Sequence, residues 1–319
     1  MRSVLYSLLR CPFCRSELTL SQDQRGDALL CRTCGRRAPV IDGIPRFVDS
    51  PQDPVARQTQ ESFGYEWTHF NDWRPSGEST FKDYFEGLAL DSLAGLTVLD
   101  AGCGMGRHAR QMAAYAGHVV AVDFSRAIDQ AARNMLDLSN VACVQADLFG
   151  LPFADASFDY VYSMGVLHHV ADTEQALLGL VRKVRPGGRL RVYLYWKRHG
   201  WQGLLLSVVT LLRRATVMLS FPLLRVLCWF LSVGLYALIV WPYRALQALG
   251  VRRHAAWPLF VYTKYPFNVL YNDQFDRFSA PIEKRYDPDD VRRLLESAGL
   301  IDVTVQACFG WVAEGTKPA

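Results

Sequence analysis

The feature that most constrains the fold is an alternation of strand-like and helix-like segments between residues 96 and 195. The apolar segments LTVLDAG, GHVVAVD, VACVQAD and FDYVYSMG predict four buried strands. Helical patterns lie among them, in RHARQMAAYA, SRAIDQAARNMLDL and TEQALLGLVRKV, and PGG leads into a fifth strand, RLRVYLYW. This alternation is typical of an α/β fold with a doubly wound parallel sheet.

Acidic side chains and glycines gather where these strands end. Each of the first three predicted strands ends close to an aspartate, namely Asp100, Asp123 and Asp147. Ligands of doubly wound sheets bind at the carboxyl ends of the strands. The loop after the first strand spaces its glycines as GxGxG, with Gly102, Gly104 and Gly106. A dinucleotide fingerprint, GxGxxG, would instead need glycine at Arg107.

The charges in this region indicate the ligand. A carboxylate at Asp100 would repel a pyrophosphate but attract a ligand that carries an ammonium and a sulfonium. Asp123 is placed to accept hydrogen bonds from ribose hydroxyls, and Phe124 beside it can cover a flat base. Asp147 can accept from an exocyclic amine near the Leu148 amide. Such a pocket suits S-adenosylmethionine, unless the three aspartates only cap helices.

Residues 96–196 resemble the class I S-adenosylmethionine-dependent methyltransferases, of the group typified by ubiquinone and small-molecule methylases. The resemblance resumes at YDPDDVRRLLESAGLIDVTVQ, as the last crossover helix and sixth strand. It implies a Rossmann-like, doubly wound, seven-stranded sheet that binds S-adenosylmethionine. The cofactor-binding residues that it implies are Asp100, Gly102, Gly104, Gly106, Asp123, Phe124, Asp147, Leu148 and Ser163.

Two CxxC pairs near the N-terminus predict a metal site. Cys11 and Cys14 are separated by sixteen residues from Cys31 and Cys34, which is the spacing of a four-thiolate zinc site. A segment of about fifty residues gains from a metal the stability that its small core lacks. A redox function is less favoured, because thioredoxin-like CxxC motifs occur singly. The other four cysteines lie scattered in apolar surroundings, which is typical of a reducing compartment such as the cytosol.

Residues 8–48 resemble the small zinc-ribbon proteins of the Trm112 type, including the trailing PVIDGIP. In that family the ribbon activates or extends a methyltransferase, which here would be fused to it. The alternative is that the ribbon only stabilises the N-terminal region.

A histidine pair follows the fourth predicted strand, in SMGVLHHV. Methyl transfer needs a base only when the acceptor must lose a proton. In related methylases of sugars and phenols a histidine here is the base, so we predict His168 as the catalytic residue, with His169 behind it. The alternative is a histidine that only packs. Upstream, Tyr65 and Trp67 belong either to a lid over the cofactor or to the core.

The segment between the fifth and sixth strands is basic and apolar. Residues 175–272 contain no acid and fourteen Lys and Arg, whereas the rest of the chain has 21 basic and 31 acidic residues, a net charge of −10. Val226–Tyr243 carries no charge and approaches the length of a membrane span. A single crossing is excluded, because both flanking strands belong to one sheet, and a second span would carry Arg213 and Arg214 at its middle.

This insertion therefore predicts a cap of interfacial helices over the cofactor. Its tryptophans and flanking arginines suit an anionic inner leaflet, namely Trp201, Trp229, Trp241, Trp257, Arg213, Arg214, Arg225, Arg244, Arg252 and Arg253. Two alternatives are a closed apolar core over a pocket and a homodimer interface. The expected domains are a zinc ribbon (1–50), a linker and helical lid (51–95), the cofactor-binding core (96–197), the insertion (198–272) and the rest of the core (273–319).

The function predicted from these features is methylation of a small lipophilic acceptor by a cytoplasmic enzyme, peripheral to the membrane. The main alternative is an RNA methyltransferase that uses the zinc ribbon for recognition, since unopposed basic residues can follow phosphates. A second alternative is a non-catalytic partner protein that binds the cofactor for structure.

Overall fold

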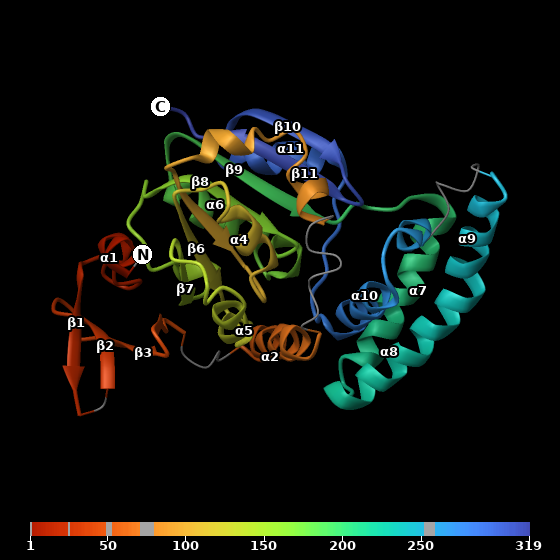
Figure 1. Ribbon diagram of the computed structural model, residues 1–319, viewed down its shortest axis with the longest axis horizontal. Helices are drawn as coiled ribbons and strands as arrows, with labels where there is room; N and C mark the ends of the chain where they lie inside the picture. The colour runs from red at the N-terminus through yellow and green to blue at the C-terminus, as the bar shows by residue number, and fades with distance from the viewer. Residues whose placement is uncertain (1, 25, 49–52, 71–79, 252–258) are drawn as a thin grey trace.

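The computed structural model describes residues 2–24, 26–48, 53–70, 80–251 and 259–319 (Figure 1). At its centre is a seven-stranded sheet with the strand order β10-β11-β9-β8-β5-β6-β7. Its strands are β5 (Thr97–Ala101), β6 (His118–Asp123), β7 (Val141–Gln145), β8 (Phe158–Met164), β9 (Val184–Leu194), β10 (Ile301–Ala307) and β11 (Trp311–Thr316). Strands β5 to β9 pair in parallel, and β11 is antiparallel to both neighbours.

Alternate residues of these strands enter two separate apolar layers. Val98 and Val119 pack on the side of α4 (Arg107–Met112) and α5 (Ala127–Asn134). Leu99 and Val120 pack on the opposite side, with α6 (Thr173–Lys183) and α11 (Pro288–Ser297). Because both faces of the sheet are covered, its parallel strands carry apolar residues toward both layers. The predicted doubly wound fold is confirmed.

The element boundaries differ from the predicted ones in several places, and helix α5 ends at Asn134, four residues before the end of its predicted pattern. Strand β9 begins at Val184, so the PGG turn lies inside the strand and not ahead of it. Helix α4 ends at Met112, four residues before the end of the helical pattern.

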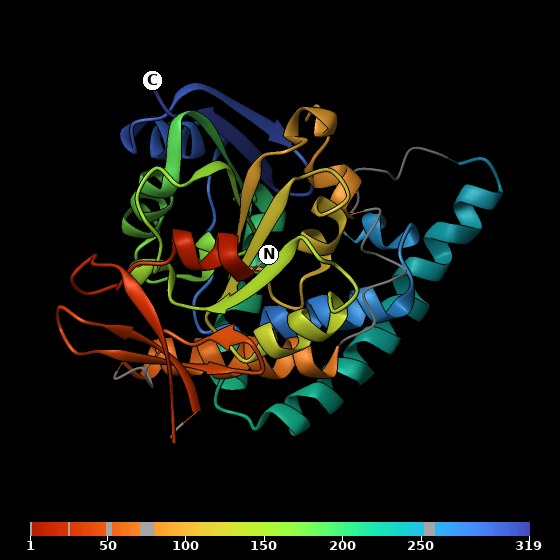
Figure 2. The same ribbon diagram turned by 60° about the vertical axis from the view of Figure 1, so that its left-hand side comes forward.

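The N-terminal unit is a small ribbon that docks on the edge of the large sheet (Figures 1 and 2). It contains α1 (Arg2–Leu8), β1 (Leu18–Asp23), β2 (Gly26–Cys31), β3 (Arg37–Ile41) and β4 (Ile44–Pro45). The Phe47 amide donates to the Gln145 carbonyl at 2.8 Å, and Arg46 forms a parallel bridge with Gln145 of β7. Leu5 and Leu9 of this unit enter the same core layer as α6. The ribbon thus covers the outer side of β7.

A helical cap lies at the opposite end of the molecule (Figure 1). It consists of α7 (Gly200–Thr216), α8 (Phe221–Leu235), η4 (Tyr236–Val240), α9 (Trp241–Ala248), η5 (Phe260–Thr263) and α10 (Phe267–Ser279), and it packs on α2 (Pro54–His69). Leu224 and Cys228 of α8 pack on Phe275 and Phe278 of α10. Helix α10 runs across the boundary expected at residue 272, so the cap continues to Ser279.

Helices α8 and α9 are joined through η4 into one continuous helix, Phe221–Ala248. Pro242 has no amide hydrogen for the carbonyl four residues before it, and the π-helical turn of η4 accommodates this gap without a break. The helix is long and apolar enough to cross a membrane, and 22% of its most apolar window is buried in the protein. Among the described helices it alone meets these criteria.

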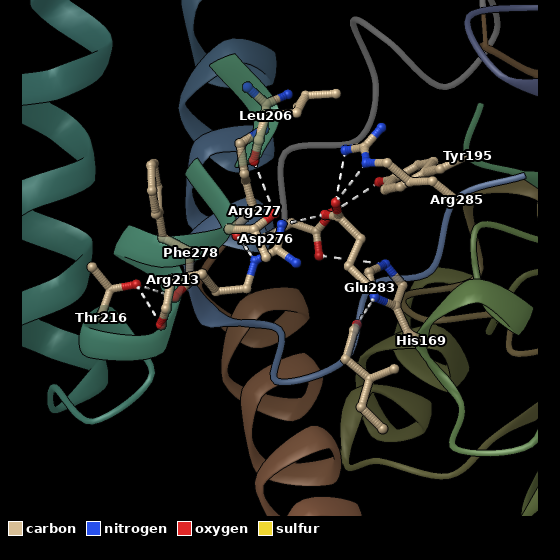
Figure 3. Close-up of polar contacts among 12 residues, drawn as sticks. His169, Tyr195, Leu206, Arg213, Thr216, Asp276, Arg277, Phe278, Glu283 and Arg285 are labelled. Carbon is tan, nitrogen blue, oxygen red and sulfur yellow. Dashed lines mark hydrogen bonds and ion pairs between the residues drawn. The ribbon is translucent and has the colours of Figure 1, made fainter. Parts of the chain in front are cut away.

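Two arginines of the cap are engaged inside the protein. Arg213 Nη2 lies 2.7 Å from Glu283 Oε2, and Arg285 Nη2 lies 2.7 Å from Glu283 Oε1 (Figure 3). Arg244 donates to the carbonyls of Thr263 and Tyr265. The expectation that Arg213 faces a membrane surface is therefore wrong, because its side chain anchors α7 to the body. The expected interfacial residues Arg252, Arg253 and Trp257 lie outside the described residues.

Candidate active site

A cavity of about 1740 Å³ opens at the carboxyl ends of the parallel strands. Its wall begins at the loops after β5, β6, β7 and β8, and continues along α2 and α10 to the apolar helices of the cap. Pockets for one small molecule usually measure about 300–1,000 Å³. The cavity therefore has room for a cofactor and a second ligand.

The glycine loop after β5 forms one side of this cavity. Gly102 has φ +86°, and a Cβ atom there would lie 2.4 Å from Cγ2 of Val166. Gly104 has φ +54°, and a Cβ would lie 3.2 Å from Nε1 of Trp67. Larger residues would be strained at both positions and would crowd the neighbouring side chains.

Helix α2 lies over this loop. Trp67 packs on Gly104 and lines the cavity, as a lid residue would. Tyr65 stacks on His69 with 3.8 Å between ring centroids and packs near Phe221 and Phe275, within the cap core. Of the two aromatic residues, Trp67 therefore occupies a lid position and Tyr65 belongs to the core of the cap.

The Asp123 carboxylate is held in the cavity wall by three donors. One oxygen accepts from the Gly104 amide at 2.8 Å, and the other accepts from the amide and the hydroxyl of Ser125 at 2.8 and 2.6 Å. Burial raises the pKa of Asp123, and the hydrogen bonds from Ser125 and Gly104 oppose that rise. The carboxylate is thereby fixed at the end of β6, with Phe124 beside it in the wall.

Asp147 has two structural roles. It accepts from the Phe149 amide at 3.0 Å, so it caps the short turn η2 (Leu148–Gly150), and it also lines the cavity together with Leu148. The capping role that was the alternative explanation for the aspartates therefore applies to Asp147. It does not remove the side chain from the wall.

Three predicted cofactor residues lie behind the wall. Asp100 accepts from the Tyr162 hydroxyl at 2.9 Å, and burial raises its pKa to about 7. Ser163 donates to the Ala101 carbonyl at 2.8 Å. Gly106 has φ +83° immediately before α4 and faces Met135. Asp100 and Ser163 thus lie within strands β5 and β8, and Gly106 ends the glycine loop at the start of α4.

The two histidines after β8 both lie in the short turn η3 (Leu167–His169), but only one of them lines the cavity. His168 is fully buried and stacks on Tyr195 with 3.8 Å between ring centroids, and it is absent from the cavity wall. His169 lines the cavity. Its Nδ1 lies 2.7 Å from the Ile282 carbonyl and its Nε2 lies 3.8 Å from Asp276 Oδ1 (Figure 3). The Ile282 carbonyl requires the proton on Nδ1, which leaves Nε2 of the neutral ring as the acceptor.

The cavity has an acidic wall that the motif analysis missed. Glu66 of α2 and Asp273 and Asp276 of α10 all line it. The Tyr262 hydroxyl donates to Asp273 at 2.7 Å, and the Tyr195 hydroxyl donates to Asp276 at 3.0 Å. One available signal was that Asp273 and Asp276 are the first acids after the acid-free segment, three residues apart and so on one helix face.

The four N-terminal cysteines come together as their spacing predicts. Their sulfur atoms all lie within 4.8 Å of one another, with 3.6 Å between Cys11 and Cys34 and 3.3 Å between Cys14 and Cys31. None of the four is in a disulfide. Four thiolates at this separation fit the tetrahedral shell of a structural zinc ion.

Comparisons with known proteins agree with both sites. Residues 99–192 match the family model of a methyltransferase domain, and residues 3–43 match that of Trm112p-like proteins. O-methyltransferase resE of Aspergillus sclerotiorum is 35% identical over 136 residues, which are 39% of this chain and 52% of that protein. Phosphoethanolamine N-methyltransferase 2 of Caenorhabditis elegans is 33% identical over 175 residues, covering 52% of this chain and 38% of that protein.

Among solved structures, a complex between the Haloferax volcanii Trm112 methyltransferase activator and a methyltransferase covers 82% of this chain and 98% of that chain. It has 16% identity and a TM-score of 0.49. The chain spans about half the length of the first curated relatives it matches. The strand-end loops fit S-adenosylmethionine and the cysteine cluster fits zinc. The chain thus joins a Trm112p-like domain, residues 3–43, to a methyltransferase domain, residues 99–192.

Proposed function

We propose that the protein transfers a methyl group from S-adenosylmethionine to a small lipophilic acceptor at a membrane surface. The observation that carries this proposal is the continuity of the cavity from the cofactor loops into an apolar groove between α7 and the α8–η4 helix. The groove is lined by Leu205, Val209, Leu212, Leu231, Leu235 and Ile239. An acceptor with an apolar tail can therefore place its other end beside the cofactor.

In this proposal Gly102 and Gly104 admit the methionine end of the cofactor, Asp123 binds the ribose and Asp147 lies beside the adenine. When bound, the cofactor supplies an electrophilic methyl group, and its sulfur keeps the bonding electron pair. The protein aligns the acceptor in line with that bond and excludes water. Nε2 of His169 receives the acceptor proton, because His169 and not His168 faces the cavity.

Asp123→Ala should weaken binding of S-adenosylmethionine by about 1.5–3 kcal/mol, since charge-assisted hydrogen bonds to the ribose are lost. Calorimetric titration measures the change, and circular dichroism checks the fold, because Asp123 also accepts from Gly104 and Ser125. Asp137→Ala is the matched control, as this carboxylate is exposed and pairs with Arg110. Equal affinities of parent and Asp123→Ala would remove Asp123 from the cofactor site.

The membrane part of the proposal rests on the outer face of the cap. Large apolar side chains that lie outside the cavity wall are exposed on both helices, among them Leu204, Leu211, Leu227, Trp229, Phe230 and Trp241. Exposed apolar side chains of this kind are typical of interfacial helices.

Charge contributes less to this surface than the sequence predicts. Among the arginines of the cap, Arg213 pairs with Glu283, and Arg244 donates to the carbonyls of Thr263 and Tyr265. We therefore expect the apolar contribution to dominate membrane binding. The same pairing leaves fewer cations for an RNA backbone.

The full-length protein should float with anionic liposomes, and binding should fall only in part with added salt. Phe230→Asp with Trp241→Asp should weaken binding by roughly 3 kcal/mol, since each change removes an apolar side chain worth about 1.5–3 kcal/mol when buried. Both side chains are more than 60% exposed and lie outside the cavity wall. Leu136→Asp, at an 82% exposed position of the body, is the control.

The outcomes separate the alternatives. A parent protein that does not float contradicts the membrane proposal. A double variant that changes from dimer to monomer on size exclusion indicates a homodimer face. Mass analysis of lipid and RNA extracts after incubation with labelled cofactor identifies the acceptor, and label in RNA alone would contradict a lipophilic one.

A further inference from the structure

The wall of the cavity beyond the cofactor loops carries an excess of buried carboxylates. Glu66 is 1% exposed, and its Oε2 has no hydrogen-bond partner among the residues that the structure describes. Oδ1 of Asp276 also lacks a hydrogen bond within that part of the chain. Burial, with repulsion from Asp276 and Asp273, raises the pKa of Glu66 well above its ordinary value. Two helices that are distant in sequence thus direct acids into one space.

The nearby cations do not neutralise this wall by direct contact. Arg107 stacks over the Trp67 ring at 5.1 Å, and the Arg277 side chain has neither a hydrogen bond nor an ion pair to the described residues. Glu283, the other buried acid here, is already paired with Arg213 and Arg285. An unpaired buried carboxylate is costly unless a proton or a cation compensates it.

The wall therefore discriminates among possible ligands by charge. A hydroxyl group would donate one hydrogen bond and leave the carboxylate charge in place. A protonated amine donates up to three hydrogen bonds and also supplies the missing positive charge. A carboxylate or phosphate facing Glu66 would add repulsion.

From Oε2 of Glu66 and Oδ1 of Asp276, two buried carboxylate oxygens of the cavity wall that lack a hydrogen bond within the described residues, we infer a binding subsite for a protonated amine of an amphiphilic acceptor. The apolar tail of this acceptor lies in the groove between α7 and α8–η4. This inference rests on the proposed function, which assigns the apolar groove to the tail of the acceptor. It narrows the acceptor class to lipophilic molecules that carry an amine.

The test compares decylamine with decanol, below their aggregation concentrations, on full-length protein loaded with S-adenosylhomocysteine. Calorimetry should show tighter binding of the amine by about 10- to 100-fold, as expected for charge-assisted hydrogen bonds. Glu66→Gln and Asp276→Asn should each reduce that preference at least about tenfold, and the affinity for S-adenosylhomocysteine should not change. Glu61→Gln, an exposed change on the same helix, should keep the preference.

Equal binding of amine and alcohol by the parent, or an undiminished preference in Glu66→Gln, would overturn the subsite. Thermal melting identifies a variant that does not fold, and Asp273→Asn then takes its place with the same expectation. The proposed function fails separately, if the parent does not bind S-adenosylhomocysteine at all.

Discussion

Glu283→Gln is expected to lower the free energy of unfolding by about 3–5 kcal/mol, because it leaves the buried Arg213 and the partly buried Arg285 guanidinium without their anion. Arg213 and Glu283 are 7% and 3% exposed, so solvent cannot replace the lost partner. Burial alone raises the pKa of Glu283, but Arg285 and Arg213 outweigh it and hold the pKa below its ordinary value. The stabilisation is therefore complete above about pH 4.3, the unfolded pKa of a glutamate, and is lost as pH falls through the folded pKa.

Urea denaturation of the parent and the variant, at neutral pH and at about pH 3 to 4, measures both effects. Glu296→Gln is the control, because Glu296 is exposed and lies 4.0 Å from Arg292 in a pair worth less than about 1 kcal/mol. If both variants lose the same small stability, the Arg213–Glu283–Arg285 cluster does not anchor the cap.

His169→Ala is expected to lower kcat by about 10²- to 10⁴-fold, the usual contribution of a positioned general base. The affinity for S-adenosylhomocysteine should stay unchanged, since His169 lies on the acceptor side of the cavity. Activity of the variant should rise with pH as the acceptor loses its proton without assistance. Steady-state kinetics across pH measures both the rate and the profile.

His168→Phe is the informative partner variant. The phenyl ring keeps the stacking on Tyr195 in a fully buried position, so we expect activity within a few-fold of the parent. If His168→Phe is inactive and His169→Ala is active, the general base is His168, the residue that the sequence indicates.

Local sequence patterns were sufficient to predict strands β5 to β9, the glycine loop and the cysteine cluster, whereas the seven-stranded sheet was implied by the family resemblance. In each case the signal lies within a few residues, as apolar strands, positive-φ glycines or CxxC pairs. Local patterns do not predict which of the two adjacent histidines lines the cavity. The rings of these adjacent residues lie only 4.3 Å apart, yet His169 lines the cavity and His168 does not, because Tyr195 stacks on His168 and the Ile282 carbonyl contacts His169.

The cap illustrates a second limit of sequence patterns. Val226–Tyr243 is apolar on all sides, so its periodicity does not assign a buried and an exposed face. Leu235 and Ile239 line the cavity, whereas Phe230 and Trp241 face outward. Acids that pair with the basic segment lie before it, as Asp155 and Asp159 do, and after it, as Glu283 and Glu314 do. The absence of acids within the segment therefore does not mean that its charges lack partners.

The docking of the N-terminal unit has a consequence for the tendency of the protein to self-associate. Phe47 and Arg46 pair with Gln145, the last residue of the edge strand β7, and so cover that end of the sheet edge. A bare edge is a template for pairing with another chain. Since thiolate-bound metal holds the ribbon together, chelation or oxidation of the four cysteines would unmask β7 and promote self-association. The zinc site would then protect the protein from aggregation, although it lies apart from the cavity at the strand ends.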